Sequence, residues 1–484
     1  MIKIIFIKEL QSCLLNRSML FTWALITGLF ILNASVSVIQ YRDRVREHET
    51  IVLKNNQKLA FDAAGGGANK EVQSLFTGEP YEKVNSVSDM VLLKQKLSSP
   101  PSPFTFISGS VEGLVPDGAG MNLFEEPEFA SFARFNPYMN SYFSIDYTNL
   151  MIYIISFFCI CFSYNAFSGE KEDGTLRLML SNSVSRASII IAKFLGLLTV
   201  FLIPLLLGFM ISCLIFELSP ALEMGVAEYA KTGYFFFVSA LLICLTLLTG
   251  FVVSALTQRS YVSLIVCLVC WAVMAIIIPN VSWIVTAQTD KIPAESAVYL
   301  EEAQQKRDLK DCYTGWRMDA NGVPEEVALA RKACIDRQTA IHNSLWREYH
   351  NQQFEQTRKA ILISKVSPFG LFRFLGDKIA GTNYYGYAAF FEQVNNYQLN
   401  YQEYIIAKDQ ADPESRHLIW NEGLCTSLVS QQNIDPADVP KFTMQPSSFR
   451  EVIADSLGDV FILCLWCIVL FAISFIAFVK YDVR

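Results

Sequence analysis

The side chains that could bind a metal or carry out acid–base chemistry are few and poorly spaced. The chain has four histidines: His48, His342, His350 and His417. His342 and His350 are eight residues apart on one expected helix, which separates them by about 12 Å along its axis, too far for one metal ion. We therefore expect no metal site and no catalytic residue, and we expect the histidines to be solvated or satisfied helix residues.

Twelve cysteines could suggest redox chemistry, but most of them lie in apolar stretches. There a free cysteine behaves as a small apolar residue, and this includes the Cys-x-x-Cys pairs at 267–270 and 464–467. The sequence also lacks a Gly-x-x-x-x-Gly-Lys-Ser/Thr phosphate loop, so any ATP hydrolysis must come from another polypeptide. Gly118-Ala119-Gly120 lacks the third glycine of a dinucleotide-binding loop, and we interpret it as a turn.

The composition indicates that part of the chain lies in a membrane. Of the 484 residues, 52% are hydrophobic and only 18% are charged, and the mean hydropathy is +0.31. A soluble domain would have about a quarter of its residues charged. The net charge of −7 argues against a nucleic-acid partner, which would require a basic face.

Six apolar segments are long enough to cross a bilayer, whose hydrocarbon core needs roughly 20 helical residues. We therefore predict an all-α polytopic membrane protein with six transmembrane helices. The predicted spans are residues 18–40, 148–167, 188–216, 233–256, 261–285 and 453–479.

The basic residues near the span ends predict the orientation. If the spans alternate, residues 1–17, 168–187, 257–260 and 480–484 share one side, which with Lys193 carries ten basic and five acidic residues. The opposite blocks are acidic: residues 41–147 contain ten basic and fourteen acidic residues, and residues 286–452 contain eighteen and twenty-two. Because Lys and Arg concentrate on the cytoplasmic side, we expect both termini there, with a short outer loop at 217–232.

The two large outer blocks are predicted to be mainly helical. Helix-forming residues dominate 294–311 and 324–364, which we interpret as a helical hairpin, and another helix is expected over 385–408. The prolines between residues 98 and 103 require an extended chain. No strand alternation persists in either block.

Cys312 and Cys334 are candidates for a disulfide across the predicted hairpin. Both would face an oxidising compartment, as would Cys425. However, Cys334 would lie about 15 Å along the second helix from its start, whereas a disulfide needs Cα atoms within roughly 7 Å. The loop would have to fold back, so both outcomes stay open.

The link between the second and third spans has a pattern suited to mechanical coupling. An acidic cluster ends the span, and Leu176, Met179 and Leu180 then fall on one face of a short amphipathic helix. Such a helix on the membrane surface can transmit force from a soluble partner to the two spans that it joins. The alternative is an ordinary loop with basic flanks.

This link resembles the coupling segment of ABC-2 type permeases, and the N-terminus resembles their amphipathic elbow helix. The resemblance covers the spans, the elbow and the link, a little under half of the chain. The elbow match involves Lys8, Glu9 and Arg17. The coupling match includes Lys193-x-x-Gly196 and the candidate ATPase-coupling residues Glu170, Glu172, Gly174, Thr175, Leu176, Leu180, Ser181 and Arg186.

The resemblance implies a dimeric assembly on two cytoplasmic ATPase subunits, in the bacterial cytoplasmic (inner) membrane. ATP and Mg would bind to those subunits, and this chain would hold no cofactor. Its partner in the membrane would be a second permease, in a homodimer or a heterodimer. We expect the membrane subunit of an exporter of an amphiphilic or lipid-linked substrate. In the alternative, the same motion acts on a periplasmic partner and no substrate crosses.

Polar residues within or beside the spans are candidates for a transport pathway. On the second span Tyr153, Ser156, Tyr164 and Asn165 could line a pathway at a dimer interface, although helix packing explains them equally well. The acidic residues Glu217, Glu223, Asp455 and Asp459 lie near span ends, and we expect them to be solvated.

Overall fold

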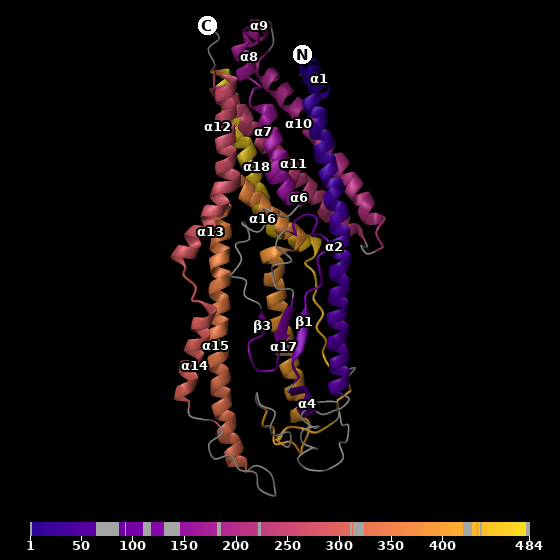
Figure 1. The fold of residues 1–484 in the computed structure, drawn as a ribbon, viewed down its shortest axis with the longest axis vertical. Helices are drawn as coiled ribbons and strands as arrows, with labels where there is room; N and C mark the ends of the chain where they lie inside the picture. The colour runs from indigo at the N-terminus through magenta and orange to yellow at the C-terminus, as the bar shows by residue number, and fades with distance from the viewer. Residues whose placement is uncertain are drawn as a thin grey trace.

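The computed structural model describes residues 2–63, 87–91, 93–109, 118–129, 146–181, 185–220, 224–309, 312, 324–419, 428–432, 434–435 and 438–480. Figure 1 shows an elongated molecule in which the spans occupy one half and the outer regions the other. The N-terminus, the C-terminus and the link between the second and third spans lie together at the far end of the span bundle. This arrangement is the one that alternating spans require.

Six helical segments of the described chain are long and apolar enough to cross a membrane, which confirms the predicted all-α six-span fold. The second and fifth spans each contain a π-helical stretch, η2 and η3. The spans are α2 (Arg17–Ala63), α6–η2–α7 (Tyr147–Asn149, Leu150–Ile155 and Ser156–Ser163), α10 (Arg186–Glu217), α11 (Val226–Leu256), α12–η3–α13 (Ser260–Ala272, Val273–Ile277 and Ile278–Thr289) and α18 (Phe449–Val479).

The first span is part of a much longer helix. The 47 residues of α2 extend about 70 Å at the usual helical rise, more than twice the thickness of a bilayer core. The charged run 42–47 therefore continues the helix beyond the span rather than ending it. Before α2 lies α1 (Ile2–Leu14), at the position of the predicted elbow.

The first outer block contains a small antiparallel sheet that the sequence did not predict. Its strands are β1 (Gln95–Ser98), β2 (Gly118–Met121) and β3 (Glu128–Phe129), in that order. The interpretation of Gly118-Ala119-Gly120 as a turn is therefore wrong. These residues lie in the central strand, where Ala119 pairs with Leu97 on one side and with Phe129 on the other. Glycine at alternate positions hides the polar–apolar alternation by which a strand is recognised, because it has no side chain.

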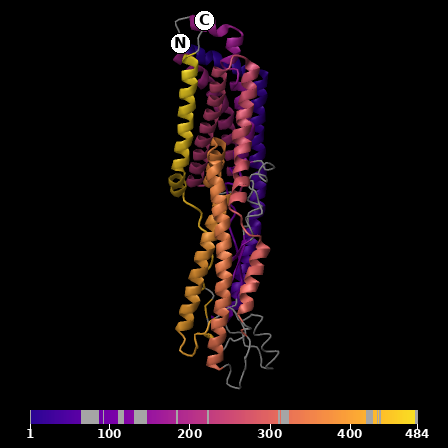
Figure 2. The same ribbon diagram turned by 90° about the vertical axis from the view of Figure 1, so that its left-hand side faces the viewer.

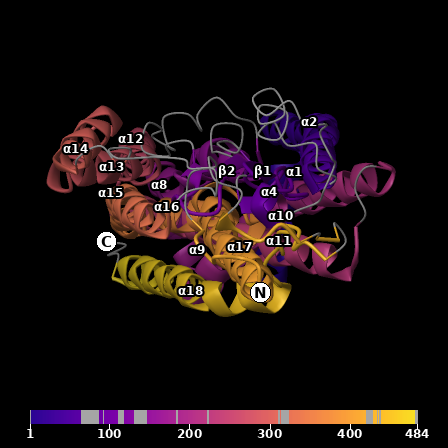
Figure 3. The ribbon, with the colours of Figure 1, turned by 90° about the horizontal axis from the view of Figure 1, so that it is seen from below.

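The second outer block consists mainly of helices. Helices α14 (Glu295–Asp308) and α15 (Glu325–Ser364) lie side by side, and α17 (Asn383–Gln410) packs with the sheet and α4 (Val87–Val91) around a second apolar core. Viewed from below, α14 lies at one edge of the molecule and α2 toward the opposite side, with the sheet and α17 between them (Figure 3). Figure 2 shows α15 and α17 extending away from the spans.

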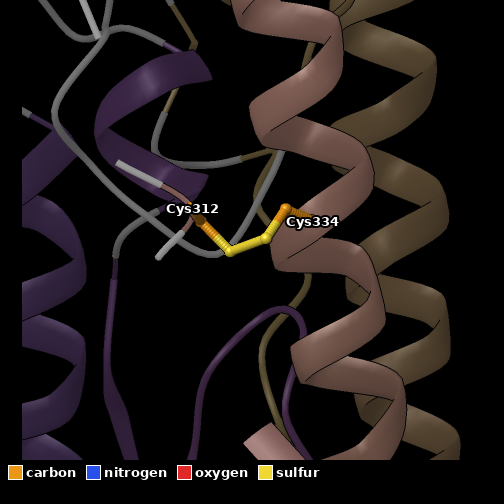
Figure 4. Close-up of a disulfide and its surroundings, with 2 residues drawn as sticks. All are labelled: Cys312 and Cys334. Carbon is orange, nitrogen blue, oxygen red and sulfur yellow. A yellow bond between two sulfur atoms is a disulfide. The ribbon is translucent and has the colours of Figure 1, made fainter. Parts of the chain in front are cut away.

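A disulfide joins Cys334, in the third turn of α15, to Cys312, which follows α14 in the sequence. Cys312 and Cys334 have Cα atoms 5.7 Å apart, within the distance that the pairing requires (Figure 4). Cys425 lies outside the described residues.

One helix of the second outer block packs among the spans. Almost every residue of α16 (Pro368–Ala380) is buried, and the helix contacts α11 and α18. Its 13 residues are too few to cross a bilayer, which is why a search for spans assigns it to the water-soluble block. The side chain of Ser367 caps its N-terminus, and Gly381, where φ is 64°, caps its C-terminus.

The structure corrects two further expectations. Asp459 is not a solvated span end, because it is buried and its carboxylate pairs with Lys365 and Lys378. His350 is also not solvated: it is buried, and its Nδ1 atom has no hydrogen-bond partner among the residues that the structure describes. Of the other acidic residues, Asp455 is exposed, Glu217 accepts a hydrogen bond from Tyr229, and Glu223 lies outside the described residues.

Candidate coupling site

Two short helices form the link between the second and third spans. Helix α8 (Ser168–Glu172) follows the second span, and α9 (Thr175–Ser181) lies at the extreme end of the molecule (Figure 1). Gly174 separates them with φ of 71°, a left-handed conformation that a residue with a Cβ adopts only at a cost. The sequence therefore turns sharply here, and the charged residues of α8 face the ends of the spans.

Glu170 points to a buried lysine of the third span. The Nζ atom of Lys193 lies 2.7 Å from a carboxylate oxygen of Glu170 and 3.0 Å from one of Glu9 in α1. Lys193 is 5% exposed, and a charge so deeply buried is stable only when it is paired. One ammonium group thus connects α8, α10 and α1.

Lys171 binds the end of the fourth span. Its Nζ atom donates to the carbonyl oxygens of Ser254, Ala255 and Thr257 at 3.3, 2.5 and 2.9 Å. These carbonyls lie at the C-terminus of α11, where helical carbonyls lack intrahelical partners and the helix dipole is negative. A lysine is a suitable cap for both reasons.

Glu172, whose charge is opposite to that of Lys171, binds the beginning of the fifth span. Its carboxylate accepts a hydrogen bond of 3.0 Å from the backbone N–H of Ser260, the first residue of α12. The positive end of the helix dipole and a free N–H favour a carboxylate at this position. Consecutive residues 170–172 therefore hold the third, fourth and fifth spans in turn.

Arg186 provides the corresponding contact with the sixth span. Its guanidinium donates to the carbonyl oxygens of Phe478 and Val479 at 3.4 and 2.6 Å, at the C-terminus of α18. Arg186 itself begins α10, with Ser185 as its N-terminal cap.

The side chain of Ser254 in α11 accepts hydrogen bonds from the backbone N–H groups of Phe167 and Ser168. These contacts fix the beginning of α8, and those of Lys171 and Glu172 fix its end.

The structure places the remaining predicted coupling residues on α9 and its approach. Leu176 is buried and Met179 packs against the main apolar core, while Gly174 and Thr175 are exposed. The side chains of Leu180 and Ser181 lie outside the described part of the chain. In the elbow, Glu9 is half-buried, whereas Lys8 and Arg17 are exposed.

The four polar residues of the second span are distributed rather than gathered in one place. Ser156 accepts a hydrogen bond of 2.8 Å from the indole N–H of Trp271, and the backbone carbonyl of Tyr164 accepts one of 2.6 Å from Ser263. Both contacts join the second span to the fifth. Tyr153 lies 3.4 Å from the guanidinium of Arg373 in α16, and Asn165 is exposed.

The sequence placed Lys171 among the charges that orient the protein, and Lys193 among those charges and in the Lys193-x-x-Gly196 match, but it did not predict the contacts of either lysine. Two signals could have found these roles. A lysine within an apolar span, as Lys193 is, requires a nearby carboxylate. Three consecutive charged residues on a short link must also point in different directions, since neighbouring residues of a helix do not face the same way.

Comparison with protein families gives a match over nearly the whole chain. The family model described as ABC-2 family transporter protein matches residues 3–483. Comparison with curated proteins returns no match. The matched range contains all six spans, most of α1 and the link that carries the candidate coupling site, and the chain belongs to the ABC-2 family of transporter proteins, as the membrane permease of an ABC system.

Proposed function

We propose that the chain is the permease subunit of an ATP-driven exporter and that α8 receives the motion of a separate cytoplasmic ATPase. The observation that carries this proposal is the arrangement of residues 170–172, which contact the third, fourth and fifth spans. Any displacement of α8 pulls directly on those spans and on the second span, to which α8 is covalently joined. A loop that served only as a connection would not need such contacts.

In this proposal the partner ATPase hydrolyses ATP, and this chain converts the resulting motion into displacement of its spans. In the proposal, ATP and Mg bind between two ATPase subunits, whose closure displaces the exposed surface of α8 and α9. A second permease, identical or related, completes the assembly. The basic residues near α8 support a location in the bacterial inner membrane with both termini in the cytoplasm. The apolar spans, with few internal charges, favour an amphiphilic or lipid-linked cargo.

A second candidate function has its own observation. Helix α2 runs without interruption from the coupling end into the outer region, so the same motion could act on a periplasmic partner without moving a substrate. The two functions share the coupling site and differ only in whether a substrate crosses the membrane.

The test is purification of the tagged full-length chain from its native membranes in mild detergent. We expect an ATPase to co-purify and to hydrolyse Mg-ATP in a vanadate-sensitive manner. Gly174→Pro should leave the complex assembled but abolish the dependence of its ATPase rate on the permease, because proline cannot adopt the positive φ of this turn. Gly458→Ala, in open space on α18, is the matched control. Absence of any ATPase from the preparation would refute the proposal.

A further inference from the structure

Lys193 connects two segments that are far apart in the sequence and that both lie at the coupling end. Glu9 belongs to the elbow α1 and Glu170 to α8, and both carboxylates contact the same buried ammonium group. The elbow also approaches α10 very closely here, because a Cβ added at Gly196 would lie 3.0 Å from the Cβ of Glu9. Ionic and steric fit therefore hold α1 against α10 at one place.

The elbow is joined to α2 by a short and well-determined turn. Leu15 and Asn16 separate the two helices, and the Asn16 side chain accepts a hydrogen bond of 3.0 Å from the backbone N–H of Ser18. The backbone carbonyl of Asn16 accepts a further hydrogen bond of 3.0 Å from the backbone N–H of Met19. With its first turn capped in this way, α2 follows the position of α1.

The far part of α2 is bonded to the outer sheet. The ring Nδ1 atom of His48 lies 3.0 Å from the hydroxyl of Ser98, and the side chain of Asn55 accepts a hydrogen bond of 3.1 Å from the backbone N–H of Lys96. Both partners belong to β1. A single helix thus extends from the elbow to the sheet, with defined polar contacts at each end.

We propose that Lys193 is a positioning residue that ties the elbow to α8, so that movement of α8 is delivered through α1 and α2 to the outer sheet. This inference rests on the proposed function, since it needs an ATPase that moves α8. It adds a route to the outer region that uses only Lys193 near the start of the third span, and then follows α1 and α2 rather than the second span or the rest of the third. The route has two joints, Glu170–Lys193–Glu9 at one end and the contacts of His48 and Asn55 with β1 at the other.

The charges at the first joint allow its two ion pairs, Lys193 with Glu9 and Lys193 with Glu170, to be broken separately. Two carboxylates share one ammonium group, so Glu9→Gln or Glu170→Gln leaves Lys193 with one acidic partner. Glu9→Gln frees the elbow and leaves α8 attached. Lys193→Met removes both links and leaves two partly buried carboxylates near each other without a counter-ion, so it is less suitable than Lys193→Arg, which keeps the charge. Gly196→Ala disturbs the elbow without changing any charge.

The experiment is hydrogen–deuterium exchange of the co-purified complex in lipid nanodiscs, with and without Mg-ATP and vanadate. In the unmodified protein we expect nucleotide to change exchange in residues 168–172, 2–14 and 95–98. In Glu9→Gln and in Gly196→Ala the change in 168–172 should persist, while the change in 95–98 falls to less than half. Lys193→Arg should preserve all three, and Gly233→Ala, which has open space around it, should behave like the unmodified protein.

The second joint provides an independent check. In the double variant His48→Ala/Asn55→Ala, the nucleotide response should remain in 168–172 and 2–14 and disappear from 95–98. A merely structural role for Glu9 would raise the basal exchange of α1 without removing the response of β1. Persistence of the full response at 95–98 in Glu9→Gln would overturn the route. Absence of any response at 168–172 in the unmodified protein would instead overturn the proposed function.

Discussion

The Nζ atom of Lys365 lies 2.9 and 2.8 Å from the two carboxylate oxygens of Asp459, which joins the end of α15 to α18. Lys378 of α16 lies 3.6 Å from the same carboxylate and donates a hydrogen bond of 2.9 Å to the backbone carbonyl of Asp455. All three charged side chains are less than one-fifth exposed. One aspartate of the sixth span therefore connects two helices of the outer block to the bundle.

Asp459→Asn should destabilise the protein, because it leaves two poorly solvated lysines without their counter-ion. Loss of one partner of a buried ion pair costs about 3 kcal/mol, and partial exposure reduces this to roughly 2 kcal/mol. Thermal unfolding in detergent should show a transition lower by a few degrees. Asp455→Asn, whose side chain is exposed, is the matched control. An unchanged transition for Asp459→Asn would contradict the structural role of the pair.

The six spans and their order were predictable because a bilayer imposes a simple requirement, about 20 apolar residues in a helix. The short helix in the link between the second and third spans was predictable for a similar reason, since the acidic cluster before it and the spacing of its apolar residues are local features. Helix α16 was not predictable, because a helix of 13 residues buried by its neighbours has no local signature. The contacts of Lys193 depend on two segments about 160 residues apart, and no periodicity within either segment reveals them.

The packing of α16 leads to a second prediction, at Gly376. A Cβ at this position would lie 2.4 Å from the hydroxyl oxygen of Thr148, which donates a hydrogen bond of 2.8 Å to the carbonyl of Ile107. Gly376→Ala must therefore displace α16 or Thr148, at a cost of about 1–3 kcal/mol. Gly458→Ala meets no atom within 4 Å and should stabilise α18 by about 1 kcal/mol. Opposite shifts in the thermal transition would support this packing, and equal shifts would contradict it.

Lys171→Met should loosen the coupling site without unfolding the spans. The substitution removes three charge-assisted hydrogen bonds from the C-terminus of α11, a loss of about 2–3 kcal/mol in local stability. We expect faster amide exchange in residues 168–172 and 252–257 and little change in the outer helices. Lys480→Met, an exposed lysine at the end of α18, is the control. Unchanged exchange in both segments would show that Lys171 does not fix α8.

The disulfide between Cys312 and Cys334 predicts a simple electrophoretic result. Protein prepared without reductant should migrate faster than the reduced form, and Cys312→Ser should remove this difference. Alkylation followed by mass measurement should find two fewer free thiols before reduction than after it. Cys425→Ser is the control and should retain the shift. A chain that migrates identically with and without reductant would place these cysteines in a reducing compartment, against the proposed orientation.

The last prediction concerns the stability of the outer region in mild acid. His350 is buried among Phe129, Trp346, Tyr349 and Phe391, and this burial lowers its pKa from 6.5 to about 4. In the unfolded chain the same histidine takes up a proton near pH 6.5. Between these values the unfolded state binds more protons, so the free energy of unfolding falls as the pH is lowered from 6.5 to 4, by up to about 3 kcal/mol.

This contribution is fully present above pH 6.5 and should disappear in His350→Gln, which cannot titrate. The measurement is thermal unfolding of both proteins in detergent between pH 4 and pH 8. The difference between their transition temperatures should be constant above pH 7 and should move in favour of His350→Gln as the pH falls toward 4. Parallel profiles across the whole range would contradict the burial of a neutral His350 between α15 and α17.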